Sequence, residues 1–259
     1  MGRAVYEAAG RTFVSPQLAT GPTDFVWLDP ATWRHVPDFA GRRIALVGNS
    51  EVLGFGPEID SYDDVLRFNH LRTWRHSAAD DGVRITIWAG VPVSRYVKKH
   101  GRLPGDPPRT FFPEVASGVR LIWALNPFHT GARFMYFLRH HALMDKFFLS
   151  GGSLFFFDLL VKTLPAEMVR SLYTIPNLRL PSGAQNLRFN FELMLAGVQT
   201  VLFCFLGGAK EIGIFGYTFY KGIEDKNWGG HDLASNERFL AALTAFAATQ
   251  GCTIRRFGA

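Results

Sequence analysis

The stretch RRIALVGNSEVLGFGPEIDSYDDVLRFNH, Arg42 to His70, organises the fold of this 259-residue chain. It contains two short apolar runs, IALV and DVLRF, and each is followed within two residues by an asparagine, Asn49 in the first case and Asn69 in the second. Runs of this length and composition are typical of strands buried on both faces of a parallel sheet. Ligands of such sheets bind at the carboxyl ends of the strands. We therefore expect Asn49 and Asn69 to lie at one binding edge.

The rest of the chain alternates between apolar runs of strand length and helical patterns. This alternation predicts an α/β fold with a single Rossmann-like, doubly wound, mainly parallel sheet. We expect an irregular N-terminal lead-in over residues 1–40 and one domain over residues 41–259. The expected strands are 43–48, 64–69, 83–90, 119–127, 211–216 and 252–257, and the expected helices are 94–101, 131–148, 153–165, 186–208 and 235–250.

Composition narrows the class of protein. Hydrophobic residues make up 47% and aromatic residues 14% of the chain, which supports a packed core and argues against disorder. The net charge of +6 favours an anionic partner, which could be a phosphorylated substrate, a membrane surface or nucleic acid, although a merely basic soluble protein has the same charge. Two cysteines, with no signal-peptide pattern and no apolar run of spanning length, indicate a cytoplasmic protein.

The turn GNS, residues 48–50, resembles a nucleotide-binding turn. Gly48 permits a tight exit from the strand, and Asn49 and Ser50 offer short polar groups. The longer stretch GNSEVLGFGPEIDSYDDVLRFN, residues 48–69, resembles the large sialyl motif of the animal-type sialyltransferases, glycosyltransferase family 29, which bind a CMP-activated sugar. In that family the two asparagines contact the nucleotide. The resemblance implies donor contacts for Asn49 and Asn69, with Gly48 and Ser50 beside them.

A second stretch, LAGVQTVLFCFLGGAKEIGIFGYTFY, covers residues 195–220 and combines a helix, a strand and the turn GYTFY. Core packing accounts for most of these residues. The layout also resembles the small sialyl motif, and the bacterial sialyltransferases of family 42 share it, with a tyrosine in the turn that steadies the leaving phosphate. The resemblance implies this role for Tyr220, with Tyr217 as its neighbour, and a donor contact at Gly197, where the helix starts.

A third stretch, NWGGHDLASNERFLAAL, places His231 just before a helical pattern. Histidine has an unperturbed pKa of about 6.5, so it can take a proton from a hydroxyl near neutral pH, although most histidines have structural or solvent roles. Both families put their general base in a loop of this kind, which implies that role for His231. Trp228 matches an aromatic residue of the bacterial family. The animal-type pattern has Glu five residues after the histidine, whereas this chain has Asn236 there and Glu237 one residue later.

Other departures from the family pattern are visible. Ala196 stands where the families have a hydroxyl residue before the glycine, and PSGAQN, from Pro181, is a second and more distant match to that signal. Ile44 and Ala209 occupy the positions of a disulfide in the animal-type enzymes, as expected of a cytoplasmic relative. A short third motif, rich in His and Tyr, is missing unless Tyr217 or Tyr220 replaces it.

We expect neither a metal nor a cofactor. The chain has no DxD sequence, and its eight histidines lack convincing ligand spacing. A CMP donor presents one phosphate diester, which needs no cation. Arg133, Arg139 and Lys146 suit either contact with a membrane surface or a solvated basic helix face. No nucleic-acid-binding motif accompanies the positive charge.

The resemblance implies the sialyltransferase-type variant of the GT-A glycosyltransferase fold and an inverting, metal-independent transfer. The donor would be CMP-sialic acid or CMP-Kdo, which the motifs do not distinguish. The acceptor would be a sugar hydroxyl of a glycan, such as a bacterial lipopolysaccharide or other surface glycolipid or a polysaccharide, reached in the cytoplasm or at the inner face of the membrane. Two alternatives stay open: a non-catalytic CMP-sugar-binding or scaffold relative, and a Rossmann-type methyltransferase.

Overall fold

The structure is a computed structural model, and every structural statement below concerns the residues that it describes. These residues are 6–7, 11–13, 27–28, 36–68, 77–89, 115, 118–125, 138, 140–149, 160, 162–173, 195–217 and 233–258.

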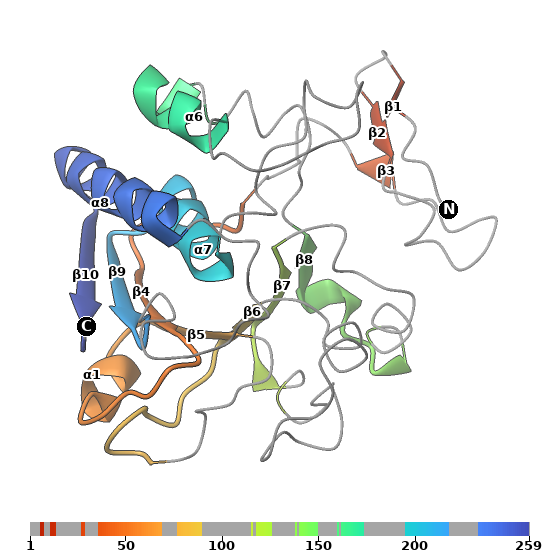
Figure 1. Cartoon of the computed structure of the whole chain (residues 1–259). Helices are drawn as coiled ribbons and strands as arrows, with labels where there is room; N and C mark the ends of the chain where they lie inside the picture. The colour runs from red at the N-terminus through yellow and green to blue at the C-terminus, as the bar shows by residue number, and fades with distance from the viewer. Residues whose placement is uncertain are drawn as a thin grey trace.

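A seven-stranded parallel sheet forms the centre of the molecule (Figure 1). Its spatial order is β10-β9-β4-β5-β6-β7-β8. The expected α/β fold with a mainly parallel sheet is therefore confirmed. The strands are β4 (Arg43–Val47), β5 (Asp64–Phe68), β6 (Ile87–Ala89), β7 (Leu121–Ala124), β8 (Phe147–Leu149), β9 (Glu211–Phe215) and β10 (Thr253–Phe257).

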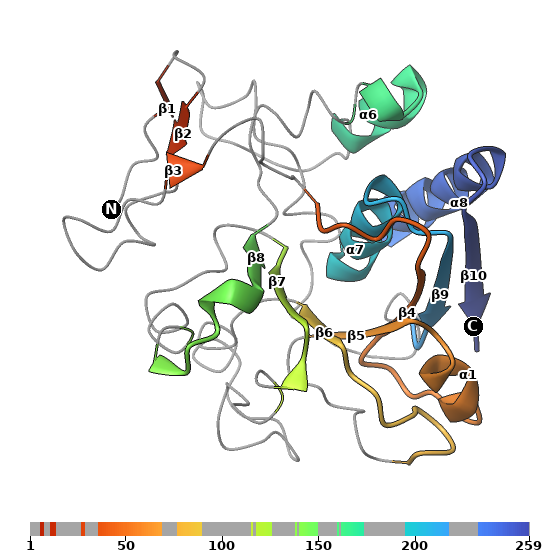
Figure 2. The same cartoon turned by 180° about the vertical axis from the view of Figure 1, so that it is seen from behind.

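The strand order reverses between β4 and β9, which are hydrogen-bonded neighbours although they are far apart in sequence. From β4 the chain proceeds through β5 towards β8 on one side, and from β9 it proceeds to β10 on the other (Figures 1 and 2). The strands that follow β4 and β9 in the sequence therefore lie on opposite sides of this central pair. Open α/β sheets bind ligands at such a topological switch point.

Apolar side chains cover both faces of the sheet, as a doubly wound fold requires. One face packs against α7 (Ala196–Leu206) and α8 (Leu233–Thr249), and the buried cluster there also includes residues of α6 (Ala166–Tyr173). The other face packs against the short helix α1 (Gly56–Asp60) and its flanking loop. Since strands buried on both faces need apolar residues at successive positions, β4 contains the continuous apolar run IALV; β5 is buried at all five positions although it includes Asp64 and Arg67.

Both α7 and α8 run from the carboxyl edge of the sheet to its amino edge. Each helix is followed within a few residues by the start of a parallel strand, β9 after α7 and β10 after α8. The first turns of both helices therefore lie at the edge where β4 and β9 end. This arrangement brings segments from all three motif regions of the sequence to one end of the sheet.

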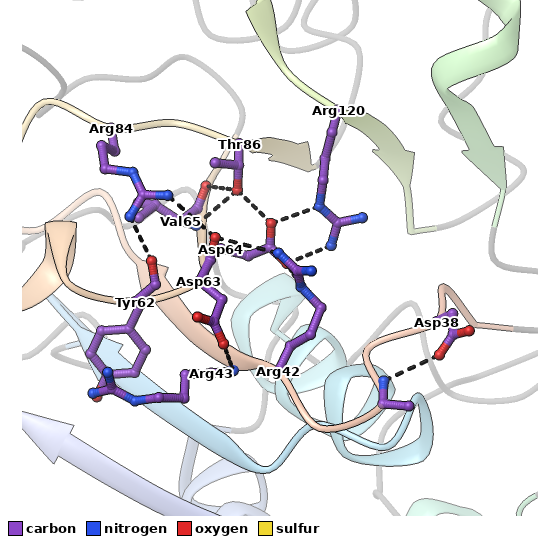
Figure 3. Close-up of polar contacts among 11 residues, drawn as sticks. Asp38, Arg42, Arg43, Tyr62, Asp63, Asp64, Val65, Arg84, Thr86 and Arg120 are labelled. Atoms are coloured by element: carbon purple, nitrogen blue, oxygen red, sulfur yellow. Dashed lines mark hydrogen bonds and ion pairs between the residues drawn. The ribbon is translucent and has the colours of Figure 1, made fainter.

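The amino edge is held by a polar cluster centred on Asp64 (Figure 3). Its carboxylate, which is fully buried, accepts hydrogen bonds from Arg42, Arg120 and Thr86. Burial by itself would raise the pKa of Asp64, but the bonds from the two guanidinium groups outweigh burial and hold that pKa below its ordinary value. The cluster ties together the starts of β4, β5 and β7. It lies at the opposite end of the strands from the switch point.

A second polar group at the amino edge surrounds Glu211, the first residue of β9. Arg43 donates to its carboxylate at 3.0 Å, and the Tyr62 hydroxyl donates at 3.0 Å. Burial alone would raise the pKa of Glu211, but these two bonds lower it. The same pairing, together with burial, raises the pKa of Tyr62. These contacts fix the register of β9 beside β4.

The six expected strands are all present, although most are shorter than the apolar runs that predicted them. The helix expected over 131–148 is wrong at its end, because 144–146 form a 3-10 turn and Phe147–Leu149 form β8, paired with β7. A short aromatic run suits a strand as well as a helix, and the neighbouring strand decides between them. The helix expected over 186–208 starts at Ala196 within the described residues, and that expected over 94–101 lies outside them.

The lead-in contains three short antiparallel strands, β1 (Tyr6–Glu7), β2 (Arg11–Phe13) and β3 (Trp27–Leu28). They form a separate small sheet, which the frequent Pro and Gly of this region did not indicate. The division into a lead-in and one domain stays a prediction.

Candidate functional site

The turns that follow β4 and β9 interlock through two glycines. The Gly48 N–H donates to the Phe215 carbonyl at 2.8 Å. A Cβ on Gly48 would overlap the Gly216 carbonyl oxygen and lie 3.0 Å from its carbonyl carbon. Gly216 has a φ of +67°, a conformation that side chains other than glycine rarely adopt. Glycine is therefore required at both positions for the two strand ends to approach so closely at the switch point.

Tyr217 follows this turn and fills the space between three segments. Its ring contacts Phe68, the last residue of β5, with ring centroids 6.0 Å apart. It also lies directly against Gly197 in the first turn of α7, since a Cβ on Gly197 would come within 2.7 Å of the ring carbon Cζ. The hydroxyl oxygen of Tyr217 is buried. The Tyr217 side chain thus packs between β5, β9 and the start of α7.

The polar residues of the predicted nucleotide turn lie at the same edge of the sheet. Asn49 is exposed and Ser50 is partly buried, directly after the buried Gly48. Asn49 therefore presents its amide to solvent at the carboxyl edge. The first N–H groups of a helix have no acceptor within the helix, and those of α7 start beside Gly197. An exposed amide, a hydroxyl and a helix N-terminus together suit a ligand that has both hydrogen-bonding edges and an anionic group.

The first turn of α8 is tied to this edge by a buried side chain. The Asn236 Oδ1 accepts a hydrogen bond from the Leu195 N–H at 2.9 Å, and Asn236 is only 1% exposed. Leu195 is the residue that precedes α7. The neighbouring Glu237 forms an ion pair with Arg256 at 3.8 Å, and Arg256 also donates to the Tyr217 carbonyl at 3.3 Å. The start of α8 therefore contacts both the start of α7 and the exit from β9.

Five of the nine predicted site residues lie in the described parts of the chain, namely Gly48, Asn49, Ser50, Gly197 and Tyr217. The structure brings them to the same edge of the sheet. The other four, Asn69, Tyr220, Trp228 and His231, lie outside the described residues.

Three of these four lie close in sequence to described elements. Asn69 directly follows Phe68 at the end of β5, which is the parallel neighbour of β4. Tyr220 comes three residues after Tyr217, and His231 comes two residues before α8 begins. The roles of all nine residues stay predictions.

The structure adds residues that the sequence motifs did not indicate, above all Asn236 and Arg256. A signal for Asn236 was present, because it shares one helix face with the buried Phe239, Leu240 and Leu243. A polar residue on such a face must find a hydrogen-bond partner in the core. No comparable signal marks Arg256, whose contact with Tyr217 joins residues 39 positions apart.

Within the described ranges, no group of three or more His, Cys, Asp or Glu side chains could hold a metal ion. The same ranges contain no helix that is long and apolar enough to cross a membrane. Both cysteines, Cys204 and Cys252, are free and buried, and burial raises the pKa of Cys252 to about 11. Ile44 and Ala209 are buried in the same apolar cluster as these cysteines.

No family model and no curated protein matches the sequence. Several solved structures resemble the fold, and they are sialyltransferases. A mammalian sialyltransferase in complex with Gal-beta-1-3GalNAc-ortho-nitrophenol is 18% identical, with a TM-score of 0.46; the match covers 84% of this chain and 69% of that chain. The sialyltransferase CstII from Campylobacter jejuni, in complex with CMP-3FNeuAc, is 14% identical, with a TM-score of 0.45; the match covers 83% of this chain and 80% of that chain. At these values the likeness is distant and does not define the activity of this chain.

Proposed function

We propose that the chain is a glycosyltransferase that moves a ulosonic acid, sialic acid or Kdo, from a CMP-activated donor to a hydroxyl group of a glycan. The observation that carries the proposal is the convergence of the motif segments at the switch point. The GNS turn, the end of β5, the first turn of α7 and Tyr217 come from distant parts of the sequence and meet at one edge. Segments that meet at one edge can contact one ligand, as the proposal requires.

The proposed donor site divides into a nucleoside part and a phosphate part. Asn49 and Ser50, together with Asn69, would contact the nucleoside, since amides and hydroxyls can pair with the polar edges of a base and a ribose. The phosphate would lie near the first turn of α7, where backbone N–H groups favour an anion. Because the Tyr217 hydroxyl oxygen is buried under the turn, we assign stabilisation of the leaving phosphate to Tyr220.

The transfer step is proposed as a single displacement that inverts the anomeric centre, without a metal ion. The acceptor hydroxyl oxygen attacks the anomeric carbon as the bond from that carbon to the phosphate oxygen breaks. His231 accepts the hydroxyl proton, and the electron pair of the broken bond leaves with CMP. Donors placed where the negative charge develops on the phosphate lower the barrier to this departure. The glycan of a bacterial surface glycolipid or polysaccharide is the proposed acceptor.

A binding panel measured by calorimetry tests the donor. CMP, CMP-sialic acid, CMP-Kdo, a UDP-sugar and a methyl donor are titrated separately into the full chain. Binding of CMP and of one CMP-sugar, without the others, is the expected result. Binding of the methyl donor in place of CMP would support the methyltransferase alternative and refute the proposal.

Release of CMP from the CMP-sugar distinguishes an enzyme from a non-catalytic binding relative, because even slow donor hydrolysis produces it. His231→Ala is expected to bind CMP like the wild-type chain and to lose transfer to an acceptor. Unchanged turnover in this variant would remove His231 as the base. Asn69→Ala is expected to weaken CMP binding, and an equal affinity would remove Asn69 from the donor site.

A further inference from the structure

We propose that Asn236 is a positioning residue for the donor phosphate, because it holds the start of α7 in place from the first turn of α8. This inference rests on the proposed CMP-binding function and extends it to a residue to which the motifs assigned no role. Asn236 does not need to touch the donor. Its effect passes through the Leu195 N–H, which it binds at 2.9 Å.

The geometry at the start of α7 gives this bond its importance. Leu195 has extended backbone angles, and no side chain of its own segment caps the helix. The N–H of this N-cap residue instead donates to Asn236, which is 41 residues away in sequence. Helix starts without a side-chain cap are prone to fray, so an acceptor from a neighbouring helix orders the backbone there. The N–H groups of the first turn of α7 are thereby held in one orientation.

Burial makes the bond specific. Asn236 is 1% exposed and shares its helix face with the buried Phe239 and Leu240, so its amide is shielded from water. A buried acceptor that lost its donor would face a desolvation penalty that water does not relieve. This single contact is therefore expected to determine the position of the α7 start relative to α8 more strongly than contacts at the surface do.

A second and weaker connection also links the start of α8 to this edge of the sheet. Arg256 joins Glu237, in the first turn of α8, to the Tyr217 carbonyl at the exit from β9. Its ion pair with Glu237 spans 3.8 Å, and both side chains are about one-third or more exposed. Exposed pairs of this length contribute little, because water and salt screen them. Asn236 is therefore expected to dominate the positioning.

The test compares CMP with cytidine, which lacks the phosphate. If Asn236 orders the N–H groups that face the phosphate, Asn236→Ala should weaken CMP binding about tenfold, which corresponds to about 1.4 kcal/mol, and change cytidine binding less than about twofold. We define the ratio as the dissociation constant of cytidine divided by that of CMP, both measured by calorimetry at a temperature where the variant is folded. This ratio reports the phosphate contribution alone. A merely structural role would weaken both ligands equally or leave both unchanged.

The matched control is Arg238→Ala, two residues along the same helix, where an exposed side chain donates to the nearby Ser235 hydroxyl. Its ratio should equal that of the wild-type chain. If Asn236→Ala does not fold, Asn236→Gln keeps the amide but displaces its oxygen by one methylene, and it should also lower the ratio several-fold.

An unchanged ratio in a folded Asn236 variant would overturn this inference while leaving the proposed function intact. A wild-type chain that binds neither CMP nor cytidine would overturn the proposed function, and this inference with it.

Discussion

Replacing Gly197 with alanine tests whether the Tyr217 ring truly lies against the start of α7. A Cβ at position 197 would come within 2.7 Å of the ring carbon Cζ and 2.9 Å of Cδ1, and closer still to Cε1. Contacts below 3.0 Å are essentially never seen for a real Cβ, so either the ring or the helix start must shift. Overpacking of this kind costs about 1–3 kcal/mol. Alanine is favoured over glycine within a helix by at most about 1 kcal/mol, so we expect a net loss of about 2 kcal/mol.

The second variant identifies the cause of that loss. In a Tyr217→Ala background the ring is absent, so Gly197→Ala should be neutral or should stabilise by up to about 1 kcal/mol through its helix preference. The interaction free energy between the two sites is then about 2–3 kcal/mol in a double-mutant cycle. Gly118→Ala is the matched control, since a Cβ there meets no atom within 4 Å. It should change stability by less than about 0.5 kcal/mol.

Urea unfolding of the four chains of the cycle, with the midpoint and slope fitted separately, measures these free energies. Additive effects of Gly197→Ala and Tyr217→Ala would refute the proposed contact. A Gly197→Ala variant as stable as the wild-type chain would refute it as well. CMP affinity of the same variants then shows whether the strain reaches the proposed donor site.

Three further predictions follow from buried groups. Asp64→Asn should lower the free energy of unfolding at pH 7 by about 2–3 kcal/mol, at the low end for a buried pair because Arg42 and Arg120 stay partly hydrated. The folded pKa of Asp64 is below its ordinary value, so the unfolded chain binds more protons. The contribution of Asp64 to stability should therefore be complete above about pH 5 and disappear as the pH falls through the folded pKa. If the stability of Asp64→Asn, measured by urea unfolding, depends on pH as steeply as that of the wild-type chain, this prediction is wrong. Gly48→Ala should lower the free energy of unfolding by about 3 kcal/mol or more. Adding Tyr217→Ala should not restore this stability, because the clash is with the backbone; restored stability would show that the strand ends can separate. Cys204 and Cys252 should resist a thiol reagent at pH 8 until the chain is unfolded, because burial raises the pKa of both; rapid labelling of the native chain would show that the core opens.

The expected strands were found because of one physical requirement. A strand covered by helices or loops on both faces needs apolar residues at consecutive positions, and runs such as IALV and EIGIF meet this requirement visibly. The glycine at position 48 was also informative, because a tight exit from a strand permits little else. The order of the strands was not readable in the same way, since it depends on which strand edges pair and not on the composition of any one run.

One error and one omission have identifiable causes. The run that forms β8, Phe147–Leu149, has no periodicity of its own, and its pairing with β7 decides its conformation. Asn236 stands where the animal-type pattern has glutamate, and the resemblance gave it no role. In the structure its amide oxygen caps the start of α7, a contact that no local pattern encodes.

By itself, the sequence determined the class of fold, the two turns that end β4 and β9, and the kind of chemistry that the motif residues suggest. These properties are local, because apolar runs and turn residues act through the backbone of their own segment. Tertiary structure alone decided that Gly48, Phe68, Gly197 and Tyr217 meet at the point where the strand order reverses, and that Asn236 fastens α8 to α7 there. Contacts between residues tens of positions apart form only when the sheet brings them together, and the ends of β4 and β5 share one edge because the two strands pair in parallel.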